Sequence, residues 1–431
     1  MLPSLKCLGV VLLGSRNPQL CSSILLFLHD GLEILCIDFG NVGQPETTRY
    51  FLREIPLRAP AITSVAFTAN PAGFYDEESW SIDSDFGEDT SKDTSMEEDL
   101  LAFVQGLKAV ETISVNRYWI TPKFLQALGQ ISTLKRVSVP KDHHYRIREV
   151  PRMDMVTYPF DSPTLTKLSL TVIDITDLSC LTNSDPLMLP RLEDFELYTN
   201  IGIDMEEDRV KQLLSAFAEV RPSMKSVSLF LHVGGSTSPM NLAFDTLSPL
   251  LALPNIKKFF VRYTSCLSIN LQELEELLVR WPKLEELALC AVGRSPIHPE
   301  AEFSHTYHVI HIAQASTTTI ITSIYSFLSE SPQAVPADPW IDVTPNSGEG
   351  MILEALRVVA RLNPNIRQLG LYLDWSPQEL SNEPLQLPNL TDLHVGTARV
   401  QDSRATAAFL VDLCNANVNI IPGSCNGTYR V

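Results

Sequence analysis

A short apolar pattern recurs along the chain at intervals typical of one structural repeat. It reads Leu-x-x-Leu-x-Leu and often follows a proline, as in Pro282-Lys-Leu-Glu-Glu-Leu-Ala-Leu289. Repeats of about 20–30 residues with this pattern indicate a leucine-rich-repeat solenoid. Most neighbouring copies are 24–32 residues apart, and two intervals are longer, at 48 and 82 residues. The twelve copies begin at Leu5, Leu32, Ile62, Val110, Leu134, Leu165, Leu192, Met224, Ile256, Leu284, Ile366 and Leu390.

The segments between these cores have the period of a helix. In Met205–Val220 the apolar residues recur every three or four positions, which predicts one buried face. Asn270 is expected to cap a helix over Leu271–Trp281, and Thr121 one that opens at Pro122. One strand with one helix cannot bury its apolar side alone, so the repeats must stack. The expected fold is therefore α/β, an irregular leucine-rich-repeat solenoid (horseshoe) with a parallel concave sheet and helices on the convex side.

Two interruptions divide the repeats. Residues 76–99 hold eleven acidic residues and one lysine, which predicts a disordered loop. Residues 293–350 contain no clear repeat, and we interpret them as an insertion of low order with one helix over Ile320–Leu328. The expected organisation is leucine-rich repeats over 1–292, the insertion over 293–350, and C-terminal repeats with a tail over 351–431.

Charge and cysteine usage narrow the classes of partner. The formal net charge is −18 and no basic stripe is present, which argues against nucleic acid as a partner. The eight cysteines form no Cys-x-x-Cys pair, which is typical of reduced thiols in a cytoplasmic or nuclear protein.

Two segments could instead be targeting or membrane segments. The apolar run Cys7–Leu13 would suit a signal peptide, but the first repeat core already accounts for it. The uncharged run Val309–Leu328 is rich in serine and threonine, so a membrane span and a membrane partner are not expected.

No known catalytic or cofactor motif is present. The sequence has no phosphate-binding loop, no dinucleotide fingerprint, no nucleophile elbow and no zinc-protease motif. His305, His308 and His311 would share a face if helical, but no further ligand completes a metal site, and incidental surface histidines are the simpler interpretation. We therefore expect no cofactor, no metal and no catalytic residue.

The residues that alternate with the buried core are the remaining candidates for function. They face away from the helices, onto the concave side. Among them are aromatic residues in what should be one row, with charged neighbours, and aromatic and arginine side chains are the common anchors of protein interfaces. The competing interpretation is that loops or a terminal tail cover these rings. The expected partner-binding residues are Tyr198, Phe230, Lys258, Phe260, Arg262, Glu286 and Tyr372.

Several phrases resemble a known family. They are Leu247-Ser-Pro-Leu-Leu251, Leu274–Leu287 with its Trp281-Pro-Lys-Leu, Asn363–Leu373, and Leu393-His-Val-Gly-Thr397. In this order they look like the irregular leucine-rich-repeat proteins of basidiomycete fungi, which commonly carry an N-terminal F-box. The resemblance implies a substrate receptor of a Skp–cullin–F-box ubiquitin ligase. No F-box-like stretch precedes Leu5, so it carries over target binding rather than docking of the Skp adaptor.

The leading expectation is thus a non-catalytic solenoid that holds a protein target on its concave face. One alternative is an enzyme with its site in the 293–350 insertion. Another is a structural remnant of a truncated F-box protein.

Overall fold

The recurring apolar pattern forms parallel β-strands, each followed by a helical segment. The computed structural model describes residues 5–11, 24–38, 45–68, 94–115, 120–139, 160–174, 189–201, 207–233, 242–263, 267–290, 309–311, 351–352, 354–371, 373–374, 386–394, 410, 413 and 418–421. These residues belong to two compact units. The first comprises Met1–Leu170, Leu187–Arg191 and Phe303–Ser331, and the second comprises Thr171–Pro186, Leu192–Glu302 and Pro332–Val431.

In the first unit the strands lie in the order β13-β1-β2-β3-β4-β5-β6. All of the pairings described there are parallel. Its strands are β1 (Cys7–Val11), β2 (Ile34–Asp38), β3 (Ser64–Thr68), β4 (Thr112–Ser114), β5 (Arg136–Ser138), β13 (Val309–His311) and the first half of β6 (Lys167–Asp174), whose last four residues fall in the second unit, and its helical segments are η1 (Leu25–Phe27), α2 (Pro45–Arg58), α3 (Thr94–Gly106) and α4 (Pro122–Gly129).

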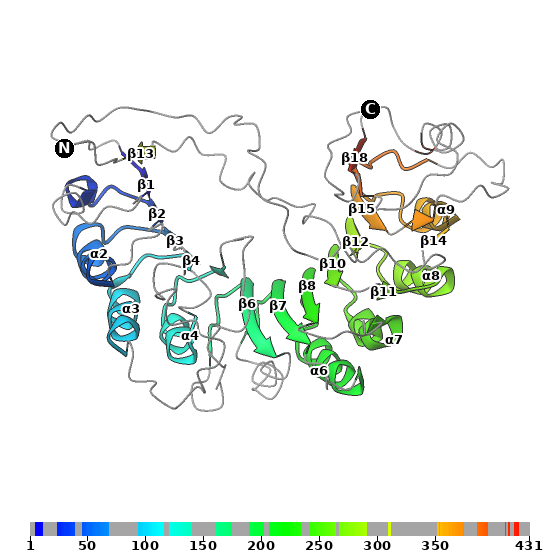
Figure 1. Ribbon diagram of the computed structural model, residues 1–431, viewed down its shortest axis with the longest axis horizontal. Helices are drawn as coiled ribbons and strands as arrows, with labels where there is room; N and C mark the ends of the chain where they lie inside the picture. Colours follow the sequence, from blue (N-terminus) through cyan, green and yellow to red (C-terminus); the bar gives the residue numbers. More distant parts are fainter. Residues whose placement is uncertain are drawn as a thin grey trace, which may run out of the picture. The chain divides into compact units, whose positions relative to one another are not determined.

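In the second unit the main strands lie in the order β7-β8-β10-β12-β15-β17-β18, again with parallel pairing. Helices α6 to α9 lie along one side of them (Figure 1). The strands are β7 (Asp194–Ile201), β8 (Ser226–Val233), β10 (Lys258–Tyr263), β12 (Glu286–Cys290), β15 (Gln368–Leu371), β17 (Asp392–His394) and β18 (Asn419–Ile421), and the helical segments are α6 (Glu207–Val220), α7 (Phe244–Leu247), η7 (Ser248–Ala252), α8 (Leu271–Arg280) and α9 (Glu354–Leu362).

Two pairs of two-residue strands add a second, minor pairing between repeats of this unit. The pairs are β9 (Leu242–Ala243) with β11 (Leu267–Ser268), and β14 (Met351–Ile352) with β16 (Leu373–Asp374). Each of β9, β11 and β14 lies between a main strand and the helix that follows it.

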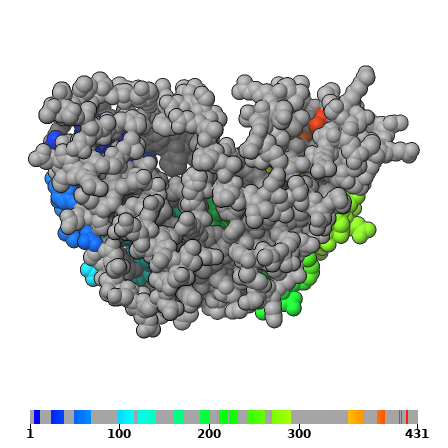
Figure 2. Space-filling model, viewed as in Figure 1, coloured from blue at the N-terminus to red at the C-terminus, as the bar shows by residue number. Residues whose placement is uncertain are grey.

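The core consists of the residues that the repeat pattern selects. Leu284, Leu287 and Leu289 are 1%, 0% and 3% exposed, and the same positions are buried in the other repeats, apart from half-buried Leu5 and from Val395, which lies outside the described residues. The fold is therefore the expected α/β leucine-rich-repeat solenoid. In the space-filling view the surface of α2 is blue and the surface of α8 is yellow-green (Figure 2).

The helix boundaries confirm the capping expectations. The Asn270 side chain accepts a hydrogen bond from the Glu273 backbone N–H at 3.0 Å, and the Glu273 carboxylate accepts one from the Asn270 N–H at 2.7 Å, which forms a capping box. Thr121 caps α4 by accepting from the Phe124 N–H at 3.2 Å. Each cap satisfies backbone donors that the first helical turn leaves without partners.

Hydroxyl groups connect successive repeats just before the strands begin. The residue ahead of the first core position donates to the backbone carbonyl of the first core position in the preceding repeat. These bonds fix the register between neighbours, and each contributes about 1 kcal/mol. They are Thr133 to Val110 at 2.7 Å, Thr164 to Leu134 at 2.7 Å, and Ser223 to Leu192 at 3.0 Å.

The structure describes only part of each of the two predicted interruptions. Thr94–Asp99, the end of the expected acidic loop, instead forms the first turns of α3, where Asp99 is 6% exposed and pairs with Arg53 at 2.7 Å. The ion pair and the burial of the apolar face of α3 stabilise the helix despite the acidic composition of those six residues. Residues 76–93 lie outside the described residues, as does the helix expected over 320–328. Within the expected insertion, Val309–His311 forms β13 beside β1.

Candidate binding face of the second unit

The sheet of the second unit has a helix-free face, formed by the residues that alternate with the buried core. Its register arranges them in three rungs that run across the strands. The first rung is Asp194, Ser226, Lys258, Glu286, Gln368, Asp392 and Asn419; the second is Glu196, Ser228, Phe260, Ala288, Gly370 and His394; the third is Tyr198, Phe230, Arg262 and Cys290.

The aromatic residues do not form the single row that was expected. Tyr198 and Phe230 share the third rung, whereas Phe260 lies on the second rung beside Ser228. Phe260 lies four residues after its first core position, Ile256, whereas Tyr198 and Phe230 lie six residues after theirs. Arg262 takes the third-rung place next to Phe230, and Tyr372 lies outside the described residues.

Tyr198 and Phe230 form a stacked pair on neighbouring strands. Their ring centroids are 4.3 Å apart with an interplanar angle of 6°, and both residues are half-buried. The Tyr198 hydroxyl donates to Glu196 Oε1 at 2.7 Å, which fixes the ring. The stack is a rigid, partly exposed apolar surface with one acidic edge.

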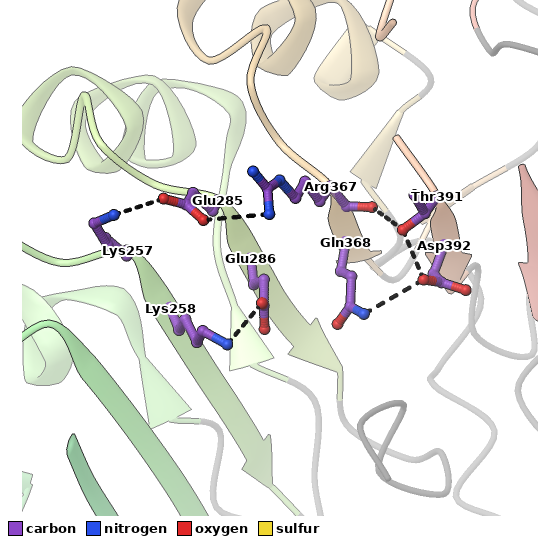
Figure 3. Close-up of polar contacts among 8 residues, drawn as sticks. All are labelled: Lys257, Lys258, Glu285, Glu286, Arg367, Gln368, Thr391 and Asp392. Atoms are coloured by element: carbon purple, nitrogen blue, oxygen red, sulfur yellow. Dashed lines mark hydrogen bonds and ion pairs between the residues drawn. The ribbon is translucent and has the colours of Figure 1, made fainter. Parts of the chain in front are cut away.

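Two of the predicted charged residues are partners of each other. Lys258 Nζ lies 2.8 Å from Glu286 Oε1, and the side chains are 45% and 14% exposed (Figure 3). The register places them opposite one another on β10 and β12. A pair this exposed contributes little to stability, about 0–1 kcal/mol, so its main effect is to neutralise the ammonium on this face.

A cluster of polar side chains on β15 and β17 was not among the predicted partner-binding residues. The Gln368 amide nitrogen donates to Asp392 Oδ2 at 3.3 Å, and Asp392 also accepts from Asn419 at 3.1 Å and from Thr391 at 2.8 Å. This orientation leaves the Gln368 amide oxygen, which is buried, without a hydrogen-bond partner among the described residues. In Figure 3 that oxygen points away from Asp392.

His394 lies beside this group on the second rung. It is 8% exposed, and its Nε2 has no partner within the part of the chain that the structure describes. Burial lowers the pKa of His394 to about 4, although the charge of Asp392 acts in the opposite direction. The ring is therefore neutral at pH 7. All three residues alternate with the buried core, Gln368 and Asp392 on the first rung and His394 on the second, and this alternation is the signal that points to them.

The helix-free face is covered unevenly. Ala288 and His394 are 6% and 8% exposed, whereas Tyr198, Phe230 and Phe260 stay half-buried. The covering of the rings that was considered as the competing interpretation is therefore incomplete at the aromatic end.

Charged residues immediately before the strands line the edge of this face. Lys225 lies 2.7 Å from Glu193, and Glu285 lies 2.8 Å from Lys257 and 4.0 Å from Arg367 (Figure 3). The hydrogen bond from Lys257 is the main cause that lowers the pKa of Glu285. Opposite charges thus lie side by side at Glu193 and Lys225 and at Lys257 and Glu285, whereas the neighbouring Lys225 and Lys257 have the same sign.

The described residues offer little to metal or redox chemistry. They contain no cluster of three or more histidine, cysteine or acidic residues that could hold a metal ion. His311 lies in β13, a strand rather than a helix, and His305 and His308 lie outside the described residues. Cys7 and Cys36 are free thiols, and burial raises the pKa of Cys36 to about 11.

Within the described residues, no helix is both long and apolar enough to cross a membrane. The enzyme alternative placed its site in residues 293–350, of which the structure describes Val309–His311 alone.

Comparison with known proteins yields similarity at the level of solved structures. No protein-family model and no curated protein sequence matches the chain. Solved structures that match include the leucine-rich repeat-containing protein LegL7 from Legionella pneumophila, at 9% sequence identity and a TM-score of 0.34. That match covers 64% of this chain and 81% of the Legionella chain.

Proposed function

We propose that this chain is a non-catalytic protein-binding solenoid and that its second unit holds a partner on the helix-free face. The observation that carries the proposal is the stacked Tyr198–Phe230 pair, at 4.3 Å and half-buried, with Phe260 on the neighbouring rung. Aromatic side chains that lose little conformational freedom on binding are the residues that contribute most to protein interfaces. A ring already fixed by a stack and by the bond to Glu196 has little freedom left to lose.

The proposed partner-binding residues have different roles. Tyr198, Phe230 and Phe260 supply apolar contact area. Glu286 and Lys258 supply polar contacts at the first rung, where their mutual ion pair sets the charge that a partner meets. Arg262 and Tyr372 complete the proposed set because they share the repeat phase of the third rung.

Alanine substitution of the aromatic residues tests the proposal. The chain and its Phe230→Ala/Phe260→Ala variant are used as baits, and the proteins that co-purify are quantified. The control is Leu57→Ala/Val279→Ala, which removes apolar side chains that are 75% and 60% exposed on α2 and α8. We expect the aromatic variant to lose the specific partners and the control to keep them. Equal recovery with all three baits would reject the assignment.

A finer role follows from the resemblance to F-box proteins of fungi. In that role the repeats would present a target to a Skp–cullin–F-box ubiquitin ligase. Co-purification of a Skp adaptor, and loss of target ubiquitination in the Phe230→Ala/Phe260→Ala variant, would support it. A partner that binds without any Skp adaptor would leave a scaffold as the function.

A further inference from the structure

Hydrogen-bond acceptors predominate on the helix-free face of the second unit. Its three rungs carry four acidic residues against two basic ones, and the Lys258 ammonium is already paired with Glu286. The acidic residues are Asp194, Glu196, Glu286 and Asp392. The whole chain has the same sign of charge, at −18. A partner that approaches this face therefore meets a negative potential.

One buried acceptor adds a local demand for a hydrogen-bond donor. Gln368 uses its amide nitrogen on Asp392, so the oxygen that remains can only accept. This oxygen is buried and has no partner among the described residues. Buried polar atoms without partners are costly, and a ligand that satisfies them gains the corresponding free energy.

The acceptors lie next to one another across three strands. Glu286, Gln368 and Asp392 occupy successive places on the first rung, on β12, β15 and β17 (Figure 3). Neighbouring strands are about 4.8 Å apart, so the three residues span about 10 Å. A guanidinium or an ammonium carries several N–H donors and no acceptor, so either group is chemically complementary to a set of acceptors.

We propose that the helix-free face of the second unit takes a basic segment of its partner protein, with a lysine or arginine side chain placed against Glu286, Gln368 and Asp392. The proposal rests on the function proposed above and names the chemistry of the partner. From β15 to β8 the sheet spans three strand spacings, or about 14 Å. The third rung lies four residues further along the strands than the first rung, or about 13 Å. The diagonal is therefore about 20 Å, and a segment of about six extended residues would reach from the acceptors to the Tyr198–Phe230 stack. Further cations of the segment would lie over the Tyr198–Phe230 stack, whose rings attract positive charge.

The direct test is the binding of a synthetic peptide to the full chain. The probe is a fluorescein-labelled peptide of four Arg-Gly repeats, measured by fluorescence anisotropy at about 0.15 M salt, where charges on distant surfaces are screened. A peptide of four Glu-Gly repeats is the comparison. We expect the arginine peptide to bind and the glutamate peptide not to bind.

Two variants of the first rung should change the affinity in opposite directions. Lys258→Met removes the competing ammonium and releases Glu286, so we expect the arginine peptide to bind about threefold more tightly. Glu286→Gln removes a carboxylate and releases Lys258, so we expect binding to weaken by about threefold or more. Each substitution lies on the exposed face of a strand, and circular dichroism checks that the fold is kept.

Each variant has a control with the same change in net charge on the helix side. Lys211→Met breaks the ion pair with Asp245 between α6 and α7, and Glu276→Gln removes an exposed carboxylate of α8. We expect neither control to change the affinity. If the controls act as strongly as the first-rung variants, or if the arginine peptide does not bind, the proposal is wrong.

The outcome separates this proposal from the proposed function. If co-purified partners depend on Phe230 and Phe260 while the arginine peptide does not bind, the face binds proteins of another chemistry and only the basic segment is rejected. If partner recovery does not depend on Phe230 and Phe260, the protein-binding function of this face is itself rejected.

Discussion

Trp281 is a large, fully buried side chain that connects three repeats of the second unit. It is 1% exposed, and its ring lies 4.7 Å from that of Phe259 in the preceding repeat, at an angle of 57°. Its backbone carbonyl accepts a hydrogen bond at 2.9 Å from the side chain of Asn363, which follows the 293–350 segment. Substitution of the Trp281 side chain therefore probes its packing against Phe259 of the preceding repeat and leaves the backbone acceptor of the Asn363 bond in place.

The expected cost follows from the side-chain volume that each substitution removes. Trp281→Ala leaves a cavity against Phe259, and large-to-small core substitutions of this kind cost about 3–5 kcal/mol. Trp281→Phe keeps one ring and removes an indole N–H that has no hydrogen-bond partner among the described residues, so we expect a cost of about 1–2 kcal/mol. Trp281→Ala should therefore be clearly more destabilising than Trp281→Phe.

Urea denaturation followed by far-ultraviolet circular dichroism measures these differences at pH 7. Val279→Ala is the control, because Val279 is 60% exposed on the same helix and surface substitutions change stability by about 0.5 kcal/mol or less. A loss below about 1 kcal/mol for Trp281→Ala would refute the packing argument.

Three further predictions concern pH, the insertion and helix packing. His394 has a pKa of about 4 in the folded chain and an ordinary histidine pKa of 6.5 in the unfolded chain, so the unfolded chain binds the proton more readily between these values. We therefore expect His394 to cost up to about 2 kcal/mol of stability as the pH falls from 7 to 5, and His394→Gln to lose this part of the pH dependence in urea denaturation. Residues 291–350 lie between β12 and β14 and include β13 of the first unit, whereas residues 234–241 connect β8 directly to β9. Replacement of residues 291–350 by the eight-residue sequence of 234–241 removes β13, which pairs with β1, but should leave the circular dichroism of the chain nearly unchanged, and a collapse of cooperative unfolding would contradict this. A Cβ at Gly129 would lie 2.5 Å from the Asp161 carbonyl oxygen, so Gly129→Ala should lower the free energy of unfolding by about 1–3 kcal/mol despite alanine's higher helix propensity, and a stabilised variant would contradict the close contact.

Most of the fold could be predicted from the sequence because one physical pattern repeats. A core such as Leu284, Leu287 and Leu289 specifies a buried strand, and Pro282 ends the preceding helix. Short connections then force neighbouring strands to lie side by side. The cap at Asn270 was predictable for the same reason, since cap and helix are local in sequence.

The elements that could not be predicted from the sequence are short or depend on residues far away in the chain. β13 and the two-residue strands carry too few residues for a period to be recognised, and β13 pairs with a strand almost 300 residues earlier in the chain. The acidic composition of residues 94–99 predicts a loop, whereas the start of α3 depends on ion pairs of buried Asp99 with Arg49 and Arg53, which lie more than 40 residues earlier in the chain.

The face of the second unit was predicted in part. Alternation placed Tyr198, Phe230 and Phe260 away from the core, and the register agrees. The prediction of a single aromatic row was wrong because Phe260 lies four residues after its first core residue, whereas Tyr198 and Phe230 lie six residues after theirs. Counting that distance would have separated Phe260 from the other two. The pairing of Lys258 with Glu286 depends on rotamers, which no sequence pattern specifies.

The claim that the helix-free face of the second unit holds a protein partner is tested most directly by site-specific photo-crosslinking. The photoreactive residue p-benzoylphenylalanine replaces Phe260 in one bait and Val279, which is exposed on α8, in the other. Both baits are irradiated in cells that express the chain, and the cross-linked proteins are identified by mass spectrometry. We expect a discrete cross-linked partner from position 260 and none from position 279. The same partners at both positions, or cross-links from position 279 alone, would contradict the claim.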